Sequence, residues 1–403
     1  MIDYNESLKI LKANLPVYER VENVCINDAS GRILAIDLKA KNDFPRFKTA
    51  SMDGYAVSFD DLKNGILKFK ILGETPAGKF PDFKIKSAEC VKTFTGAILC
   101  ENADTIVPIE NVEISGDDEI LIKESVSENF AVRKIGESYK KNEILLKKGT
   151  RLDFASLGLL AELGFSKINV FSRPKIAILV TGSELLEIGQ KAQNDSQIYS
   201  SNHIILNALI HSWGGDSEVL PIIKDDKNAL KNAVEKALEN CDFLITTGGV
   251  SVGDYDFMRD IMHSSDFEIL IDKVSVKPGR HIKIAKFGEK LIFALPGFSV
   301  SAAVMSFLFV RETLNEILNI HENFKISAVL AENYMKKSKF LEFVPCSLKI
   351  ENTKIFASIY GKKSGSSAII SNLINSDLFL APLEKTELKK GEIVEVLLLK
   401  SKF

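Results

Sequence analysis

The sequence predicts a multi-domain protein in which an α/β domain is combined with two β-rich domains. The chain has 403 residues, more than a single hydrophobic core usually organises. Between residues 173 and 320, short apolar strands alternate with helical patterns, as they do in α/β proteins. Short β runs separated by Gly, Pro and Asp occupy residues 45–133, and alternating β runs occupy residues 321–403.

The composition is that of an ordinary globular protein. Hydrophobic residues make up 45% of the chain and charged residues 26%. The 52 Lys and Arg against 54 Asp and Glu give a net charge of −2, so no overall basic field favours nucleic acid or an anionic membrane. The longest apolar stretch is too short to span a bilayer, and the first residues lack an export signal. We therefore expect a cytoplasmic protein with no nucleic-acid or membrane partner.

Residues 1–44 and 134–171 are predicted to form one N-terminal linker domain. Leucines repeat at helical spacing in the first part, and Asn5 can cap that helix. A helix is predicted again at residues 153–163, followed by a short strand. Because helical character resumes after residues 45–133, we predict that the β-rich domain is inserted into the linker domain.

The α/β domain is predicted from buried apolar strands and from amphipathic helices between them. The strands are expected at residues 175–180, 218–223, 241–247 and 291–297. The helices are expected at residues 203–212, around 230–238, and at 299–318. Gly214 and Gly215 end the first of these helices, and Trp213 is expected to pack at that helix end. The C-terminal β domain carries 13 Lys against 9 Asp and Glu, which makes it locally basic.

Polar and glycine-rich residues follow the strands of this domain. They form the segments Thr181–Glu184, Lys224–Asp226, Gly248–Asp256 and Pro296–Gly297. The carboxyl ends of strands in an open α/β sheet are where ligands bind, and glycines let the backbone approach a ligand closely. An aspartate in one such position can equally be a turn former or a helix cap. The coincidence at several strand ends is what favours a binding site.

The types of charged residue at these ends suit an anion and a divalent cation. Lys273, Ser275 and Lys277 alternate and would share one face of a strand, and Arg280 follows within a turn. Such a cluster suits a phosphate or another oxyanion, although alternating lysines can also form a solvated face. Carboxylates on neighbouring strand ends could hold Mg²⁺ that is shared with phosphates; they are Glu184, Asp225, Asp254 and Asp256.

Several other chemistries are excluded by missing motifs. The five cysteines form no C-x-x-C pair, which argues against a disulfide framework and a structural zinc site. There is no P-loop, no G-x-G-x-x-G after a strand and no H-E-x-x-H. Residues 297–301 resemble a nucleophile elbow but lack its final glycine, so a hydrolase triad is not expected. Of the five histidines, only His281 lies where it could line the anion site.

Six short motifs in one order carry a resemblance to a known family. They are Ser51–Val57, Thr95–Ala97, Thr181–Glu184, Gly248–Asp256, Lys277–Gly279 and Leu295–Gly297. Together they resemble the molybdopterin molybdenumtransferase family, which comprises bacterial MoeA and the E domain of gephyrin. The resemblance covers essentially the whole chain.

The resemblance implies a fold and an activity. It implies a linker domain at residues 1–44 with 134–171 and an inserted β-rich domain at 45–133. A three-layer α/β molybdopterin-binding domain would follow at 172–320, and a small β-barrel at 321–403. The family inserts molybdate into adenylylated molybdopterin, releasing AMP with Mg²⁺ present, in molybdenum cofactor biosynthesis.

The resemblance also implies roles for individual residues. The catalytic positions would be Asp53, Thr95, Glu184, Asp225 and Asp256, of which Glu184, Asp225 and Asp256 would bind the metal. The substrate-binding positions would be Gly248, Gly249, Ser251, Gly253, Asp254, Lys273, Lys277, Arg280, Pro296, Gly297, Ser299 and Ser301. Because Asp53 and Thr95 belong to the inserted domain, the family's homodimer with a shared active site is expected here too. The adenylyltransferase that supplies the substrate is a possible further partner.

Two departures from the family pattern and three alternatives remain open. The family usually has Asn-Pro where Phe298 and Ser299 stand, so Ser299 and Ser301 are the candidate substitutes for the lost polar contacts. Ser138 stands where the family commonly has an aspartate, so no catalytic acid is assigned there. The alternatives are a molybdopterin adenylyltransferase, a scaffold protein, and an inactive pterin-binding relative.

Overall fold

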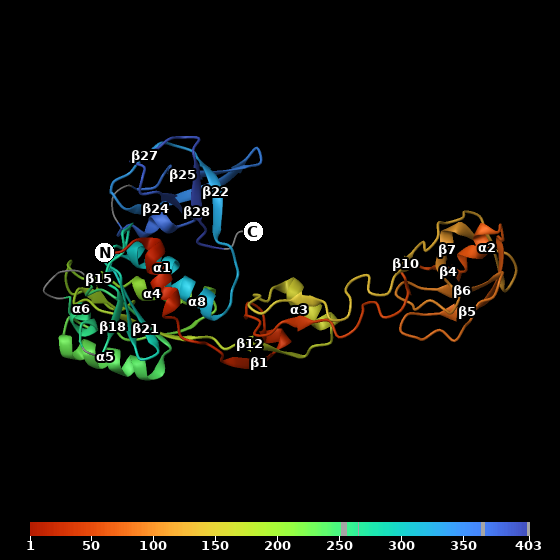
Figure 1. Cartoon of the computed structure of the whole chain (residues 1–403), viewed down its shortest axis with the longest axis horizontal. Helices are drawn as coiled ribbons and strands as arrows, with labels where there is room; N and C mark the ends of the chain where they lie inside the picture. The colour runs from red at the N-terminus through yellow and green to blue at the C-terminus, as the bar shows by residue number, and fades with distance from the viewer. Residues whose placement is uncertain (251–255, 265, 364–366, 401–403) are drawn as a thin grey trace. The chain divides into compact units, whose positions relative to one another are not determined.

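The protein is described by a computed structural model that covers residues 1–250, 256–264, 266–363 and 367–400. The chain divides into two compact units, one formed by residues 37–147 and the other by residues 1–36 together with 148–403 (Figure 1). The second unit contains a mixed α/β sheet and a β-barrel, which confirms the predicted multi-domain α/β class. Among the described residues, no helix is both long and apolar enough to cross a membrane. The finer four-domain boundaries stay a prediction.

The unit of residues 37–147 is built on a six-stranded sheet in the order β7-β4-β6-β5-β9-β8. Its strands are β4 (Gly54–Val57), β5 (Lys68–Thr75), β6 (Glu89–Thr93), β7 (Thr105–Pro108), β8 (Val112–Ile114) and β9 (Glu119–Ile122). Strand β4 is buried on both faces, since Tyr55 and Val57 join one apolar cluster and Ala56 joins another. Gly54 is required in this strand because a Cβ there would lie 2.3 Å from the carbonyl oxygen of Val107.

Short elements complete the unit of residues 37–147. Two small ladders pair β2 (Leu38–Lys39) with β11 (Ile144–Leu146) and β3 (Thr49–Ala50) with β10 (Val132–Arg133). A short helix α2 (Phe59–Lys63) and a 3₁₀ turn η2 (Ile109–Asn111) lie between strands. Each ladder pairs a segment near the start of the unit with a segment near its end, so the two ends of this β-rich unit are held together.

In the other unit, helix α1 (Tyr4–Ala13) confirms the predicted N-terminal helix but not its cap. Asp3, rather than Asn5, is the N-cap: its Oδ1 accepts hydrogen bonds from the backbone N–H of Asn5 at 2.7 Å and of Glu6 at 3.4 Å. Both residue types can cap a helix, and a carboxylate also interacts favourably with the helix dipole. The predicted second helix is α3 (Phe154–Glu162), capped by Asp153.

The strand after α3 pairs with the start of the chain. β1 (Val21–Cys25) runs antiparallel to β12 (Lys167–Phe171), with a 3₁₀ turn η1 (Ile26–Asp28) following β1. Segments that flank the unit of residues 37–147 in sequence are therefore joined through a strand pair on one body.

The central sheet has the strand order β16-β13-β17-β21-β20-β18. Its parallel strands are β16 (Asp216–Val219), β13 (Lys175–Val180), β17 (Phe243–Thr247) and β21 (Lys290–Leu295), and its antiparallel edge consists of β20 (Lys283–Phe287) and β18 (Glu268–Ile271). The strand predicted at 218–223 has the wrong bounds: β16 begins two residues earlier and ends at Val219. Beyond it, Ile223 makes an isolated bridge to Thr181.

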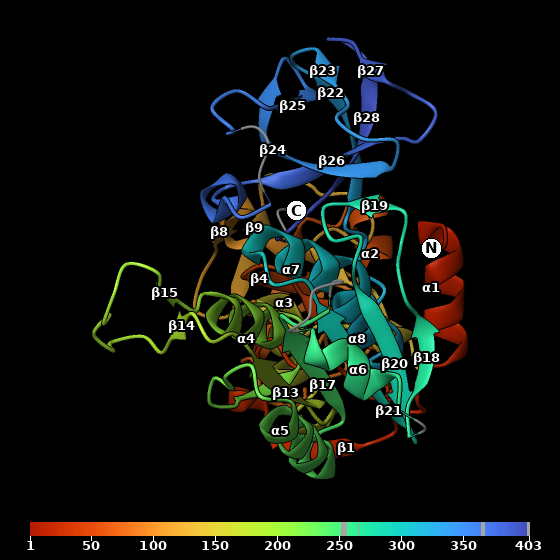
Figure 2. The same ribbon diagram turned by 90° about the vertical axis from the view of Figure 1, so that its left-hand side faces the viewer.

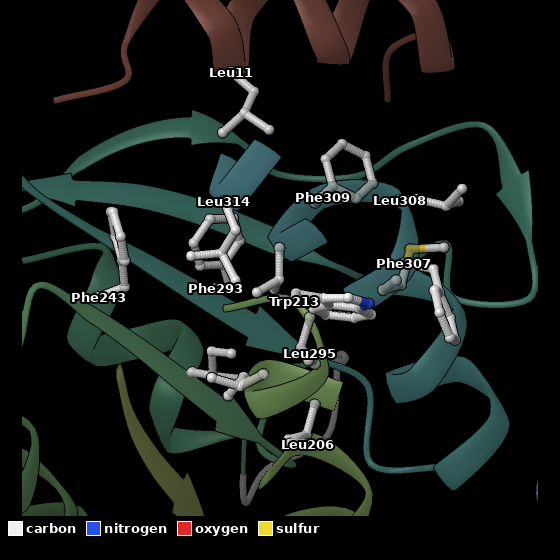
Figure 3. Close-up of a cluster of buried hydrophobic side chains, with 14 of the residues drawn as sticks. Leu11, Leu206, Trp213, Phe243, Phe293, Leu295, Phe307, Leu308, Phe309 and Leu314 are labelled. Carbon is white, nitrogen blue, oxygen red and sulfur yellow. The ribbon is translucent and has the colours of Figure 1, made fainter. Parts of the chain in front are cut away.

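Helices cover both faces of this sheet (Figure 2). One apolar cluster contains side chains of α4 (Asn202–Ser212), α7 (Ser299–Met305) and α8 (Arg311–Ile317); the other contains those of α5 (Lys227–Asn240) and α6 (Phe257–Met262). The helix predicted at residues 299–318 is continuous, with a π-helical segment, η3 (Ser306–Val310), in its middle. Trp213 packs at the end of α4, edge-to-face against Phe307 at 5.1 Å (Figure 3). Its predicted packing role is confirmed.

The C-terminal β runs form a closed barrel. Strands β24 (Leu341–Glu351), β25 (Lys354–Ser358), β22 (Lys325–Leu330), β28 (Ile393–Leu397) and β26 (Asp377–Ala381) pair in that order, and β26 pairs back to β24. The small elements are β23 (Tyr334–Met335), β27 (Glu387–Leu388) and η4 (Ile370–Leu373). Strand β19 (Val276–Lys277) leaves the α/β part of the chain and pairs in parallel with β24. This pairing ties the barrel to the cation-rich segment that the sequence singles out.

Candidate active site

A cavity of about 1020 Å³ lies between the carboxyl ends of the central strands and the barrel. Its walls come from the ends of β13, β17 and β21, from the turn after β19, and from barrel residues 334–345 and 359–372. Most of the predicted substrate-binding residues line it: Gly248, Gly249, Lys277, Arg280, Pro296, Gly297, Ser299 and Ser301. Ser251, Gly253 and Asp254, also predicted, lie outside the described residues. Residues as far apart in the sequence as Thr181 and Asn372, which are 191 positions apart, thus share one cavity.

The three predicted metal ligands are not gathered into one cluster. Glu184 and Asp256 line the cavity, but Asp225 does not. The Asp225 carboxylate instead accepts hydrogen bonds from Thr181 Oγ1 at 3.2 Å and from the backbone N–H of Ser183 at 2.9 Å. Over the described stretches of the chain, no three His, Cys, Asp or Glu side chains converge on one point. Asp225 therefore joins two strand ends, and two of the three predicted metal ligands remain at the cavity wall.

Gly248 shows how closely the strand ends approach one another. Its φ is +93°, and a Cβ at this position would lie 2.6 Å from the carbonyl oxygen of Thr181. Both the backbone conformation and the close approach therefore require glycine. The turn after β17 is thereby held beside the end of β13, where the cavity begins.

Gly248→Ala is expected to lower the thermal unfolding midpoint more than Gly189→Ala, because a clash is added to the conformational strain. Gly189 has a similar φ of +90° but has no atom within 4 Å of its missing Cβ. We expect a loss of about 1 kcal/mol for the control and about 2–3 kcal/mol for Gly248→Ala. Calorimetric unfolding of both variants measures the difference, and equal losses would mean that Thr181 moves aside freely.

Lys277 is placed at the cavity by its strand pairing. In the β19–β24 ladder it lies opposite Glu342, and its Nζ is 3.4 Å from Glu342 Oε1. The Glu342 side chain is only 2% exposed and also accepts from Tyr334 Oη at 2.7 Å and from the backbone N–H of Lys337 at 3.2 Å. Burial raises the pKa of Glu342, but hydrogen bonds from Tyr334 and Ser338 and the charge of Lys277 outweigh burial, so the pKa lies below its ordinary value. A buried, ionised carboxylate therefore anchors the cavity lysine.

The two other predicted cations differ in position. Arg280 lines the cavity, whereas Lys273 is half-buried and does not belong to the wall. The predicted alternation is present, since Val274 and Val276 are buried while Lys273, Ser275 and Lys277 are half-exposed, although only Val276–Lys277 forms a strand. We expect Lys277 and Arg280 to be the direct anion contacts.

The loop with the unusual Phe298–Ser299 sequence is held from two sides. Asn202 is 7% exposed, and its Nδ2 donates to the carbonyl oxygen of Gly297 at 2.8 Å. The backbone N–H of Val300 donates to the carbonyl oxygen of Ser367 at 3.0 Å. Within the part of the chain that the structure describes, Ser299 Oγ donates one long hydrogen bond of 3.5 Å, to the carbonyl oxygen of Ala368, and Ser301 is buried. The loop is thus held by hydrogen bonds to its backbone, one of them from the Asn202 side chain, without the amide and proline that are usual in the family.

Asp53 and Thr95 form the candidate site of the other unit. Asp53 Oδ1 accepts from both the backbone N–H and the Oγ1 of Thr95, at 2.8 and 2.9 Å. These two hydrogen bonds, the backbone bond first, hold the pKa of Asp53 below its ordinary value. Both side chains are exposed, so a charged carboxylate with fixed orientation faces solvent. In the same unit the hydroxyl of Ser138, which stands where the family commonly has an aspartate, accepts a hydrogen bond from Arg133 Nη2 at 2.7 Å.

Among the lining residues that sequence reasoning missed, Asn202, Tyr334 and Glu342 make the side-chain hydrogen bonds described above. Glu342 sits in an ordinary alternating β run, and only its pairing with Lys277 distinguishes it from the other barrel acids. Asn202 follows Ser201 at a helix start, so its local pattern is that of a cap. No local signal in the sequence separates these residues from structural ones.

Three family profiles match the chain in the order of its parts. They are described as the MoeA N-terminal region (domain I and II) over residues 2–164, a probable molybdopterin binding domain over 177–316, and the MoeA C-terminal region (domain IV) over 327–399. Over 387 residues the chain is 30% identical to a molybdopterin molybdenumtransferase of Staphylococcus aureus (strain COL), covering 94% of this chain and 91% of the relative. The chain belongs to the MoeA family.

Further comparisons agree with this membership. The molybdopterin molybdenumtransferase of Staphylococcus epidermidis (strain ATCC 35984) is 29% identical over 411 residues, covering 99% of this chain and 96% of the relative. The crystal structure of the MoeA molybdopterin biosynthesis protein from Pyrococcus horikoshii is 29% identical, covers all of both chains, and has a TM-score of 0.85. The predicted family, transferase class and place in molybdenum cofactor biosynthesis are confirmed.

Proposed function

We propose that this MoeA-family enzyme inserts molybdate into adenylylated molybdopterin and releases AMP. The observation that carries the proposal is the cavity of about 1020 Å³ at the strand ends, which is lined by cations and by the three carboxylates of Glu184, Asp256 and Glu342. Both substrates are anions, and a lysine and an arginine on one turn suit phosphate and molybdate oxygens. The glycine turn at Gly248–Gly249 and the loop at Pro296–Gly297 let a ligand approach the backbone.

In this proposal each charged group has a separate task. Lys277, fixed by Glu342, and Arg280 bind the oxyanions and neutralise their charge. Asp53, ionised and held by Thr95, is suited to accept a proton from an attacking water or to orient it. Because the barrel forms part of the wall, it limits the access of bulk water to the bound substrate.

The residues at the wall fit a Mg²⁺ ion that is completed by the substrate. Glu184 and Asp256 offer carboxylate oxygens, and Mg²⁺ is commonly held by one or two carboxylates together with substrate phosphates and waters. Asp225 does not line the cavity, and its carboxylate accepts bonds from Thr181 and Ser183, so we assign it the task of holding these strand ends together beside the two wall carboxylates. When bound, Mg²⁺ would supply charge neutralisation at the pyrophosphate.

Formation of active cofactor tests this function. The purified protein, supplied with adenylylated molybdopterin, molybdate and Mg²⁺, is expected to reactivate a cofactor-free molybdoenzyme. Tight pterin binding without reactivation would favour an inactive relative, one of the alternatives left open by the sequence. The match along the full chain to molybdenumtransferases supports the transferase over an adenylyltransferase or a scaffold.

We further propose a cytoplasmic homodimer in which Asp53 of one chain serves the cavity of its partner, as the family resemblance implies. Mixing Asp53→Ala with Asp256→Ala chains tests this arrangement. Random pairing makes half of the dimers mixed, and each mixed dimer would keep one intact site, so about one quarter of wild-type activity should return. Activity that stays absent would mean that one chain supplies both acids. The adenylyltransferase that makes the substrate is a proposed transient partner.

A further inference from the structure

The turn that follows Lys277 contains an arginine whose guanidinium is held on two sides. Arg280 Nη2 lies 3.0 Å from Nε2 of His281, and its Cζ lies 5.6 Å from the ring centroid of Phe340. His281 comes from the α/β part of the chain and Phe340 from the segment that leads into the barrel, and all three side chains line the cavity. An exposed arginine usually samples many rotamers, so two such contacts restrict where its charge can lie.

The histidine can play this part only as a neutral ring. Arginine is always protonated and only donates, so His281 Nε2 must accept, and the ring proton is on Nδ1. Burial, and then the charges of Arg280, Lys273 and Lys283, hold the pKa of His281 below its ordinary value, although Asp256 acts in the opposite direction. Nδ1 is buried and has no partner among the described residues. Within the described chain, the bond to Arg280 is therefore the ring's one hydrogen bond.

The contacts leave the rest of the guanidinium for a ligand. Within the described residues only Nη2 has a hydrogen-bond partner, which leaves the donors of Nε and Nη1 available. Gly279, with φ +99°, turns the chain so that Lys277 and Arg280 both reach the wall of the cavity. An oriented arginine fork next to a fixed lysine is suited to a tetrahedral oxyanion, because two parallel N–H donors match two of its oxygens.

We propose that His281 and Phe340 are positioning residues that hold Arg280 over the cavity as an oxyanion clamp. The inference rests on the proposed function and assigns these two residues a role in it. The ligand chemistry is a tetrahedral oxyanion, either molybdate or a phosphate monoester such as AMP. The barrel contributes to the clamp through Phe340, which gives this domain a part in recognition as well as in enclosing the cavity.

A double-mutant cycle on equilibrium binding tests the proposal with the full-length protein. Molybdate and AMP are titrated separately by calorimetry into wild type, His281→Phe, His281→Gln, Arg280→Ala and the His281→Phe/Arg280→Ala double variant. His281→Phe keeps a ring but removes the acceptor, and it should weaken binding of at least one anion about 10-fold. Gln can present an amide oxygen to Arg280, so His281→Gln should remain within about threefold of wild type. Phe340→Leu should weaken the same anion by a smaller factor.

The decisive comparison is made without the arginine. In the Arg280→Ala background, His281→Phe should have no further effect beyond about twofold, because the two residues act through one contact. An equal loss in both backgrounds, or no loss in wild type, would overturn the positioning role. His321→Phe, at an exposed histidine that does not line the cavity, is the matched control and should bind as wild type. If wild type bound neither anion, the proposed function itself would be refuted, and the clamp with it.

Discussion

Asp53→Ala is expected to lower turnover by about 100-fold or more while the fold stays intact. The carboxylate is exposed and, among the described residues, accepts hydrogen bonds from Thr95 alone, which is itself exposed, so its removal leaves no buried group without a partner. Steady-state AMP release measures the loss, and circular dichroism checks the fold. Asp43→Ala is the matched control: Asp43 also accepts a backbone hydrogen bond, from Lys141 at 2.7 Å, but belongs to none of the site motifs.

Asp53→Asn separates the charge of this residue from its hydrogen bonds. The amide oxygen can still accept from Thr95, so a comparable loss of turnover would identify the negative charge as the required property. Because the pKa of Asp53 lies below its ordinary value, the group stays ionised from about pH 5 upward, and it should cause no loss of activity between pH 5 and 8. A fully active Asp53→Ala enzyme would remove this residue from the mechanism.

Lys277→Ala is expected to weaken the binding of molybdate or AMP by about 10- to 100-fold, since a fixed charge is lost from the cavity wall. Lys273→Ala should change it by less than about threefold, because Lys273 does not line the cavity. The sequence pattern predicts both lysines as anion contacts, whereas in the structure Lys277 lines the cavity and Lys273 does not, so the two variants distinguish these predictions. Calorimetric titration of both variants gives the comparison, and equal losses would place the anion nearer to Lys273.

Removing Lys277 also deprives Glu342 of its cationic partner. The pair is half-exposed on the lysine side, so we expect a stability loss of only about 1 kcal/mol. Adding Glu342→Gln should recover this stability, because the amide can still accept from Tyr334, but it should not recover anion binding. If Glu342→Gln restored anion binding, the effect of Lys277→Ala would be structural.

Local sequence patterns correctly predict most of the helices and strands of the α/β domain. The run that became β17 is apolar at nearly every position because both faces of the sheet are covered by helices, and Gly214 adopts the positive φ that a helix end favours. The strand before Lys224 was misplaced because its first residues, Asp216 and Ser217, are polar at the sheet edge, and apolar content alone moved the prediction toward residues 220–223.

The sequence predicts only those site residues that directly follow a strand. That Glu184 and Asp256 follow strands can be read from the sequence, and so can their place at one edge of the sheet. The hydrogen bonds of Asp225 with Thr181 and Ser183 depend on the contact between two loops that lie 42 residues apart in the sequence. The pairing of Lys277 with Glu342 depends on a barrel strand 65 residues later. Such long-range contacts leave no periodic signal in the sequence.

Release of AMP from adenylylated molybdopterin tests the central claim most directly. The purified protein is incubated with the substrate and Mg²⁺, with and without molybdate, and AMP is quantified over time. We predict AMP release that molybdate stimulates and that Asp53→Ala abolishes. Binding of the substrate without any AMP release, in the presence of molybdate and Mg²⁺, would contradict it.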